Sequence, residues 1–84
     1  MPVLSRFYGI TIRMYFLQKE HNPPHIHAIY GDDVAAITIS DGTILEGALP
    51  GKALEMVREW IALHKKELTT IWETQNFVHL PPLE

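Results

Sequence analysis

Residues 21–30 read His-Asn-Pro-Pro-His-Ile-His-Ala-Ile-Tyr, and the rest of the chain is organised around this stretch. Neither Pro23 nor Pro24 can donate to a sheet ladder, and Pro24 keeps Pro23 out of the helical region. We therefore expect a connector over residues 18–24 and a strand over residues 25–30. Alternation along that strand separates one face from the other: His25, His27 and Ile29 against Ile26, Ala28 and Tyr30.

Alternating residues predict further strands on both sides of this one. Residues 7–16 have an apolar face and a polar face: Ile10, Ile12, Met14 and Phe16 against Thr11, Arg13 and Tyr15. Gly31-Asp32-Asp33 predicts a turn before a strand at 34–40, whose apolar face is Ala35, Ile37 and Ile39. Asp41-Gly42 is the strongest hairpin signal, and a short strand is expected at 43–46.

The second half of the chain predicts one long helix. Apolar residues recur at helical spacing over residues 52–74, and neither Gly nor Pro interrupts them. We place the helix within residues 50–74 and expect residues 75–84 to be extended against the domain or a partner. The predicted fold is α+β: a three- to four-stranded antiparallel meander over residues 7–46, with the helix packed across one face.

Composition restricts the class of protein. The chain has 84 residues, 46% hydrophobic and 20% charged, which is typical of one globular domain, residues 1–84. Without cysteine it can form neither a disulfide nor a thiolate zinc site. A net charge of −3 provides no general attraction for nucleic acid. The apolar run at 14–17 is too short for a secretion signal or a membrane span, so we expect a cytoplasmic protein with no membrane partner.

Common catalytic motifs are absent from the sequence. It contains no P-loop, no dinucleotide fingerprint and no HExxH helix, and Ser5 and Ser40 lack a nucleophile elbow. The chemistry that remains lies with the histidines, because three of the five fall at positions 21, 25 and 27.

Acid–base catalysis is one interpretation of the pair His25 and His27. Their Cα atoms should lie about 7 Å apart on one sheet face. If the apolar strand faces pack under the helix, Arg13 and Tyr15 share that opposite face. An imidazole can serve as general acid or base near neutral pH, and a guanidinium can stabilise a phosphate. The four residues predict metal-independent RNA cleavage, with either histidine as the base.

Metal binding and a structural role are the other interpretations. Two imidazoles on one face can share a divalent metal, and a turn at Asn22-Pro23 would bring His21 within reach as the third ligand. Further candidate ligands are His64, Glu67, Asp32 and Asp33. In the structural interpretation the motif is a rigid connector, His64 is a semi-buried histidine, and the tryptophans are core or interface residues. That binding or structural set is His21, Pro23, Pro24, Trp60, His64 and Glu67.

Five segments together are distinctive: Leu4-Ser5-Arg6-Phe7-Tyr8-Gly9-Ile10, Met14-Tyr15, His21 to His27, Leu49-Pro50 and Trp60 to Leu68. Through them, nearly the whole chain resembles the small bacterial proteins called domain of unknown function 4160. The resemblance implies no established activity. It implies one half of a small two-gene module, commonly beside a second short protein and suspected of a toxin–antitoxin role.

We therefore interpret the chain as a component of a toxin–antitoxin-like pair that acts through its histidine pair, without a cofactor. The alternatives are a non-catalytic interaction module and a histidine-ligated protein that binds a divalent metal. The expected partners are a small protein encoded nearby, a second copy of the chain and RNA.

Overall fold

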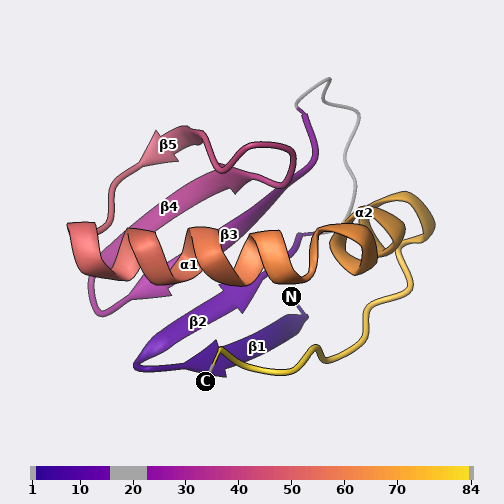
Figure 1. Cartoon of the computed structure of the whole chain (residues 1–84), viewed down its shortest axis with the longest axis horizontal. Helices are drawn as coiled ribbons and strands as arrows, with labels where there is room; N and C mark the ends of the chain where they lie inside the picture. Colours follow the sequence, from indigo (N-terminus) through magenta and orange to yellow (C-terminus); the bar gives the residue numbers. More distant parts are fainter. Residues whose placement is uncertain (1, 16–22, 84) are drawn as a thin grey trace.

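The computed structural model of this chain describes residues 2–15 and 23–83. Its elements in order are β1 (Val3–Phe7), β2 (Ile10–Arg13), β3 (His25–Tyr30), β4 (Asp33–Thr38), β5 (Ile44–Gly47), α1 (Gly51–Leu63) and α2 (Lys65–Thr74). The described strands form one antiparallel sheet in the order β1-β2-β3-β4-β5, and α1 crosses one face of it (Figure 1). The α+β class and the antiparallel meander are confirmed. The predicted strand number was too low, because residues 2–15 and 23–83 already form five strands.

β1 is the strand that the sequence pattern did not predict. The register shifts between Val3 and Ser5, which marks a bulge. Consecutive residues of a strand normally point to opposite faces. Leu4 and Ser5 are nevertheless both buried, with exposed fractions of only 0% and 2%. Because both are buried, the segment lacks the period of two by which a strand is recognised.

The prediction of a continuous strand over residues 7–16 was wrong at its start. Tyr8 and Gly9 have φ angles of 50° and 79° and form a two-residue turn between Phe7 and Ile10. Positive φ at both positions is the geometry of a type I′ hairpin, which joins twisted antiparallel strands well. Tyrosine is an uncommon residue there, so the turn gave little sequence signal. Phe16 lies outside the described residues.

The turn between β4 and β5 is confirmed where Asp41-Gly42 predicts it. The Asp41 carboxylate accepts hydrogen bonds from the Thr38 hydroxyl and from the Thr43 backbone N–H. These bonds lower the pKa of Asp41, because they favour its charged form. The Arg58 side chain donates to the Gly42 carbonyl at 2.9 Å, which ties α1 to this turn.

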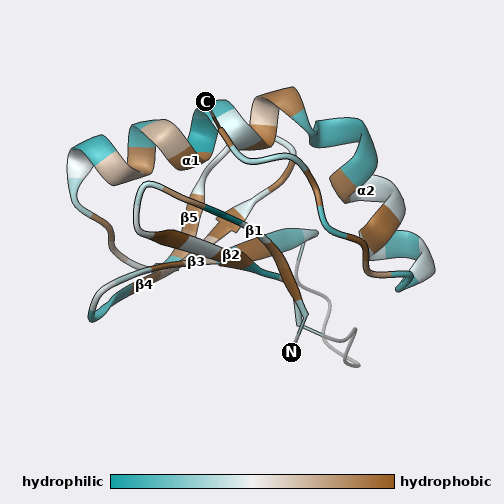
Figure 2. Cartoon of the chain, turned by 90° about the horizontal axis from the view of Figure 1, so that it is seen from below, coloured by the Kyte–Doolittle hydropathy of each residue, from teal (hydrophilic) through white to brown (hydrophobic). Residues whose placement is uncertain are grey.

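The prediction of one long helix was wrong, because the helix is broken at His64. This residue has φ −117° and ψ 19°, and its N–H bonds to the carbonyls of Trp60 and Ile61. Figure 2 shows both helices on one side of the sheet, with α2 turned toward the end of the sheet. No Gly or Pro marks the break, so helix propensity could not signal it. The His64 ring lies 5.0 Å from the Trp60 ring, four residues earlier on α1.

The core lies between the sheet and the helices, where hydrophobic residues of both layers face each other (Figure 2). Trp60 on α1 is its largest buried side chain and is 0% exposed. The indole Nε1–H donates to the Pro81 carbonyl at 2.8 Å, and the Leu80 N–H donates to the Leu4 carbonyl at 2.8 Å. These bonds hold the C-terminal residues beside β1, as Figure 1 shows.

Candidate functional site

One transverse row of residues crosses the sheet on the face that points away from α1. We call this the open face, since none of the described helices covers it (Figure 2). The register pairs Arg13 with His27, His27 with Ala36, and Ala36 with Glu46. Directly paired residues point to the same side of a sheet, so the row runs from β2 to β5. Arg13 and His27 therefore share a face, as the alternation predicted.

The core residues of β3 confirm the direction of the histidines. Ile26 and Ala28 are 0% exposed and belong to the hydrophobic core, whereas His25 and His27 alternate with them and are half-buried. The two imidazole rings lie 5.2 Å apart. The strand thus presents both rings on one side, close enough to act on one group.

His25 is fixed in position by its neighbours at the start of β3. Its Nδ1 lies 2.9 Å from the Pro23 carbonyl, and its ring lies 5.2 Å from the Trp72 ring on α2. A carbonyl can only accept a hydrogen bond, so Nδ1 carries the proton in this contact. The other ring nitrogen, Nε2, is then left to exchange a proton. Pro24 also has a structural role, because its carbonyl accepts a bond from the Ile39 N–H at 3.0 Å.

Three side chains surround the His27 ring: a tyrosine, an arginine and a second histidine. The Tyr15 ring meets its ring edge-on at 4.2 Å, Arg13 is its partner on β2, and His25 lies beyond it on β3. Burial lowers the pKa of His27 below its usual 6.5, the nearby His25 lowers it further, and Glu46 acts in the opposite direction. His27 is therefore uncharged near neutral pH and can accept a proton.

Two nitrogen atoms in this part of the site are buried without a hydrogen-bond partner among the described residues. They are the Nδ1 of His27 and the Nε of Arg13, which lie on directly paired residues. A buried polar atom without a partner destabilises the fold, so such atoms draw attention to a functional site. The uncharged imidazole beside the guanidinium forms an arrangement that can take a proton and stabilise a developing negative charge.

Sequence reasoning missed two residues that contact or face the histidines. Trp72 was predicted to be a core or interface residue, and its contact with His25 depends on the break at His64. Glu46 was assigned to a strand but to no site. Glu46 is in the row only because the register shifts between Ala36 and Ile37, and no residue pattern predicts that shift.

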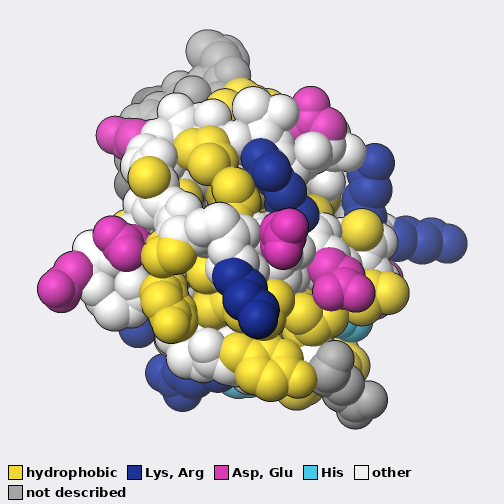
Figure 3. Space-filling model, turned by 60° about the vertical axis from the view of Figure 1, so that its left-hand side comes forward, with side chains coloured by type: hydrophobic (Ala, Val, Ile, Leu, Met, Phe, Trp, Pro, Cys, Tyr) yellow, Lys and Arg dark blue, Asp and Glu magenta, His cyan; other side chains and the backbone are white. Residues whose placement is uncertain are grey.

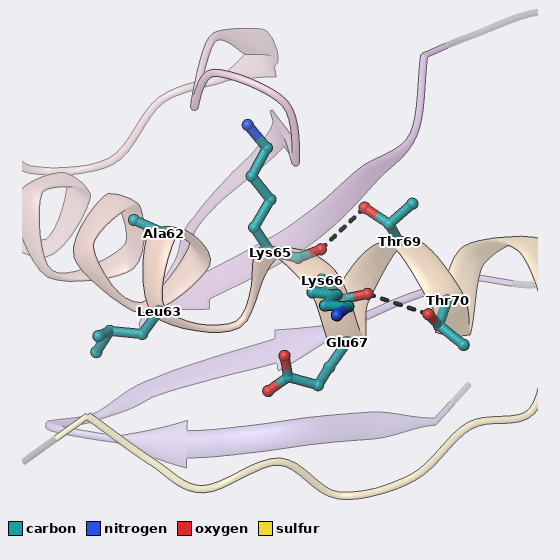
Figure 4. Close-up of a pocket in the computed structure, with 7 residues that line it drawn as sticks. All are labelled: Ala62, Leu63, Lys65, Lys66, Glu67, Thr69 and Thr70. Atoms are coloured by element: carbon teal, nitrogen blue, oxygen red, sulfur yellow. Dashed lines mark hydrogen bonds between the residues drawn. The ribbon is translucent and has the colours of Figure 1, made fainter.

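His64 lies apart from the pair, on the helical side of the sheet. Its side chain is 13% exposed, and its Nδ1 lies 3.2 Å from the Glu67 carboxylate. That bond lowers the pKa of Glu67. A pocket of about 480 Å³ lies beside this junction, and its lining comes from both helices: Ala62, Leu63, Lys65, Lys66, Glu67, Thr69 and Thr70 (Figure 4). In Figure 4 the side chains of Lys65 and Glu67 point in opposite directions, so the pocket does not gather them around one point.

Metal binding gains no support from the described residues. Among residues 2–15 and 23–83, no cluster of three or more His, Cys, Asp or Glu side chains is placed to hold a metal ion. The predicted third ligand, His21, lies outside the described residues. Asp32 and Asp33 are exposed at the turn after β3.

The fold and site define a small α+β protein with an antiparallel meander and a histidine pair on its open face. The chain belongs to the family described as "Domain of unknown function (DUF4160)", whose model matches residues 9–73. No curated protein and no solved structure matches the chain significantly. Within the part of the chain that the structure describes, no helix has the length and apolar character needed to cross a membrane.

Proposed function

We propose that this protein is a metal-independent ribonuclease and one half of a toxin–antitoxin-like pair. The observation that carries the proposal lies on the open face, where an uncharged His27 is paired with Arg13 across the strands and has a second imidazole 5.2 Å away on its own strand. Two titratable groups of one type in different environments are a common sign of an acid–base pair. The family resemblance described above supports the pairing with a second small protein.

The mechanism assigns the base to His27 and the acid to His25. His27 takes the proton of a ribose 2′-hydroxyl, whose oxygen then forms a bond to phosphorus. The bond from phosphorus to the 5′-oxygen breaks, and His25, which enters this step as the imidazolium, gives its Nε2 proton to that oxygen and keeps the proton on Nδ1. Arg13 stabilises the negative charge that develops on the phosphate oxygens. The products are a 2′,3′-cyclic phosphate and a 5′-hydroxyl, and neither a metal nor an oxidant is needed for the balance.

The charge of the chain sets an expectation for substrate binding. Its net charge of −3 opposes the non-specific attraction that most RNA-binding proteins use. Arg6 and Arg13 are the arginines of β1 and β2, and both belong to the open face through their register with Thr11 and His27. We therefore expect few phosphate contacts and a weak dependence of cleavage on salt.

The test is an RNA cleavage assay in EDTA with analysis of the new ends. Wild-type protein should produce cyclic phosphate ends, and His27→Ala should reduce the rate by about a hundredfold or more. His79→Ala is the matched control, because His79 is an exposed histidine of the C-terminal segment outside the row. Cleavage that persists in folded His27→Ala protein, or that disappears in EDTA, would contradict the proposal.

A second candidate function is protein binding by the apolar residues at the end of the sheet where the hairpin turns lie. Tyr8, Tyr30, Val34 and Leu45 are 60%, 40%, 44% and 43% exposed. Figure 3 shows hydrophobic side chains reaching the surface between charges of both signs. Large exposed apolar side chains commonly contribute to protein interfaces.

The oligomeric state in solution tests this second candidate. Light scattering should give a dimer, or a complex with the co-expressed neighbouring gene product. Val34→Lys and Leu45→Lys should dissociate it and leave RNA cleavage unchanged. A monomer that binds no neighbouring gene product would contradict the candidate.

A further inference from the structure

The row on the open face carries opposite charges at its two ends. Arg13 lies on β2 and Glu46 on β5, with His27 and Ala36 between them. Strands lie about 4.8 Å apart, so the Cα atoms of Arg13 and Glu46 are roughly 14 Å apart. Among residues 2–15 and 23–83 the one salt bridge is on the helices, so neither charge of the row is neutralised by an ion pair within this part of the chain.

This row is complementary to itself about one two-fold axis. Two sheets can pack face to face about 10 Å apart, with their side chains meeting between them. Let the axis run along the strands in that plane, midway between β3 and β4. Rotation by 180° then places the partner's Glu46 over Arg13 and the partner's Ala36 over His27, and every contact occurs twice. Opposite charges face each other, and the imidazole ring faces the shortest side chain of the row.

The neighbouring row of the open face adds an apolar contact about the same axis. The register pairs Ile29 on β3 with Val34 on β4. Ile29 is half-buried and Val34 is 44% exposed. Their chain neighbours Ala28 and Ala35 belong to the core, so this pair points to the open face, which no described helix covers (Figure 2). The same rotation places the partner's Val34 over Ile29, beside the contact between the charges.

We propose that two copies of this chain associate through their open faces, with Arg13 of each copy opposite the partner's Glu46. An axis that lay on β3 or on β4 would leave both charges without an opposite charge, so the charges select one arrangement. The association covers Arg13 and His27, so the dimer is a resting form whose row RNA cannot reach. That regulatory role rests on the proposed ribonuclease function, whereas the dimer itself can be measured in a protein that cleaves no RNA.

The size of the open face sets the expected strength of the dimer. Four spacings from β1 to β5 span about 19 Å, and the six residues of β3 span about 20 Å. A footprint of roughly 400 Å² per copy is small beside the area of about 800 Å² per partner in a standard stable interface. We therefore expect a dimer that forms at micromolar concentrations or above and dissociates on dilution.

Light scattering of two charge-reversal variants, alone and mixed, tests this inference. Arg13→Glu and Glu46→Arg each bring like charges together twice, so each alone should raise the dissociation constant by about tenfold or more. An equimolar mixture of the two should form a heterodimer about as tight as the wild-type dimer, because each contact again joins opposite charges. Glu55→Arg is the matched control, since Glu55 is exposed on α1 in the other layer and its reversal should not affect the dimer.

Three outcomes overturn the inference: a wild type that stays monomeric at about 1 mM, folded single variants that dimerise like the wild type, or a mixture that remains monomeric. Circular dichroism checks folding first. Glu46 is exposed on an edge strand, so Glu46→Arg remains informative even if Arg13→Glu does not fold. A dimer that is lost in Tyr8→Lys but kept in Glu46→Arg would belong to the hairpin turns and would also overturn the inference.

The dependence of RNA cleavage on protein concentration tests the resting role. The wild-type rate per molecule should fall as the concentration rises through the dissociation constant, whereas that of Glu46→Arg should stay constant. Below that concentration, variants that only dissociate the dimer should cleave like the wild type. A wild-type rate that is constant across the range would overturn the resting role. A dimer that follows the charge reversals, in a protein that cleaves no RNA, would support the interface and overturn only the proposed function.

Discussion

The ring of Trp72 on α2 lies 5.2 Å from the ring of His25 on β3. The contact connects the helical layer to the histidine pair at the end of the sheet. It depends on the helix break, because α2 can turn toward this end only if the chain leaves the helical conformation at His64.

Replacement of Trp72 should weaken catalysis by releasing His25. In Trp72→Leu the imidazole keeps its bond to the Pro23 carbonyl but loses its ring contact, so its orientation becomes less restricted. Small displacements of a catalytic group reduce rates by about tenfold to a hundredfold. The checks are the cleavage rate and the NMR shifts of the His25 ring protons. Trp72→Phe retains an aromatic ring and should keep most of the activity, and an equal loss in both variants would contradict this reason.

Stability should fall with acidification through His27. Its pKa is lowered in the folded protein from 6.5, mainly by burial, so below pH 6.5 the unfolded chain binds a proton that the folded chain resists. The contribution is complete above pH 6.5 and is lost as the pH falls toward the lowered folded value. Urea unfolding at several pH values should show a smaller loss in His27→Gln than in wild type. Parallel curves for the two proteins would count against this assignment.

Gly47 should tolerate no side chain. It has a φ of 81°, and an added Cβ atom would overlap the Val34 carbonyl oxygen in the backbone of β4. We expect Gly47→Ala to reduce the free energy of unfolding by at least about 2 kcal/mol, through backbone strain and the loss of β4–β5 pairing.

Gly51→Ala is the matched control for that measurement. An added Cβ there meets no atom within 4 Å, and Gly51 is the first residue of α1. The change should be neutral or stabilise the protein by about 0.5 kcal/mol in chemical denaturation. Equal losses at both glycines would show that the steric argument for Gly47 is wrong.

The Tyr8-Gly9 turn offers a stabilising substitution. Tyr8 has a φ of 50°, a strained backbone conformation for tyrosine, and its side chain is 60% exposed. Burial of the side chain therefore offsets little of the conformational strain. Asn-Gly is the preferred pair for a type I′ turn, and Tyr8→Asn should stabilise the protein by about 1 kcal/mol in thermal unfolding. Tyr8→Ala has no such preference and should give no gain. A gain of the same size in both variants would point to removal of the ring as the cause.

Much of the fold could be predicted, because strands with one buried face leave a strong pattern. β3 was predicted with the bounds that the structure gives, and Ile26 and Ala28 are buried as alternation requires. β1 could not be predicted, since its bulge buries two consecutive residues and removes the pattern. The break at His64 was also unpredictable, because neither Gly nor Pro lies there.

The sequence by itself determined the antiparallel meander and grouped His25 with His27 and Arg13 with Tyr15, because side chains alternate along a strand. That the two groups share the face turned away from α1 was decided by the tertiary structure. Only the tertiary structure decided which groups stand beside them. Trp72 reaches His25 through a bend, and Glu46 enters the row through the register of β4 with β5. Both results come from packing between distant segments, and local residue patterns carry no information about such contacts.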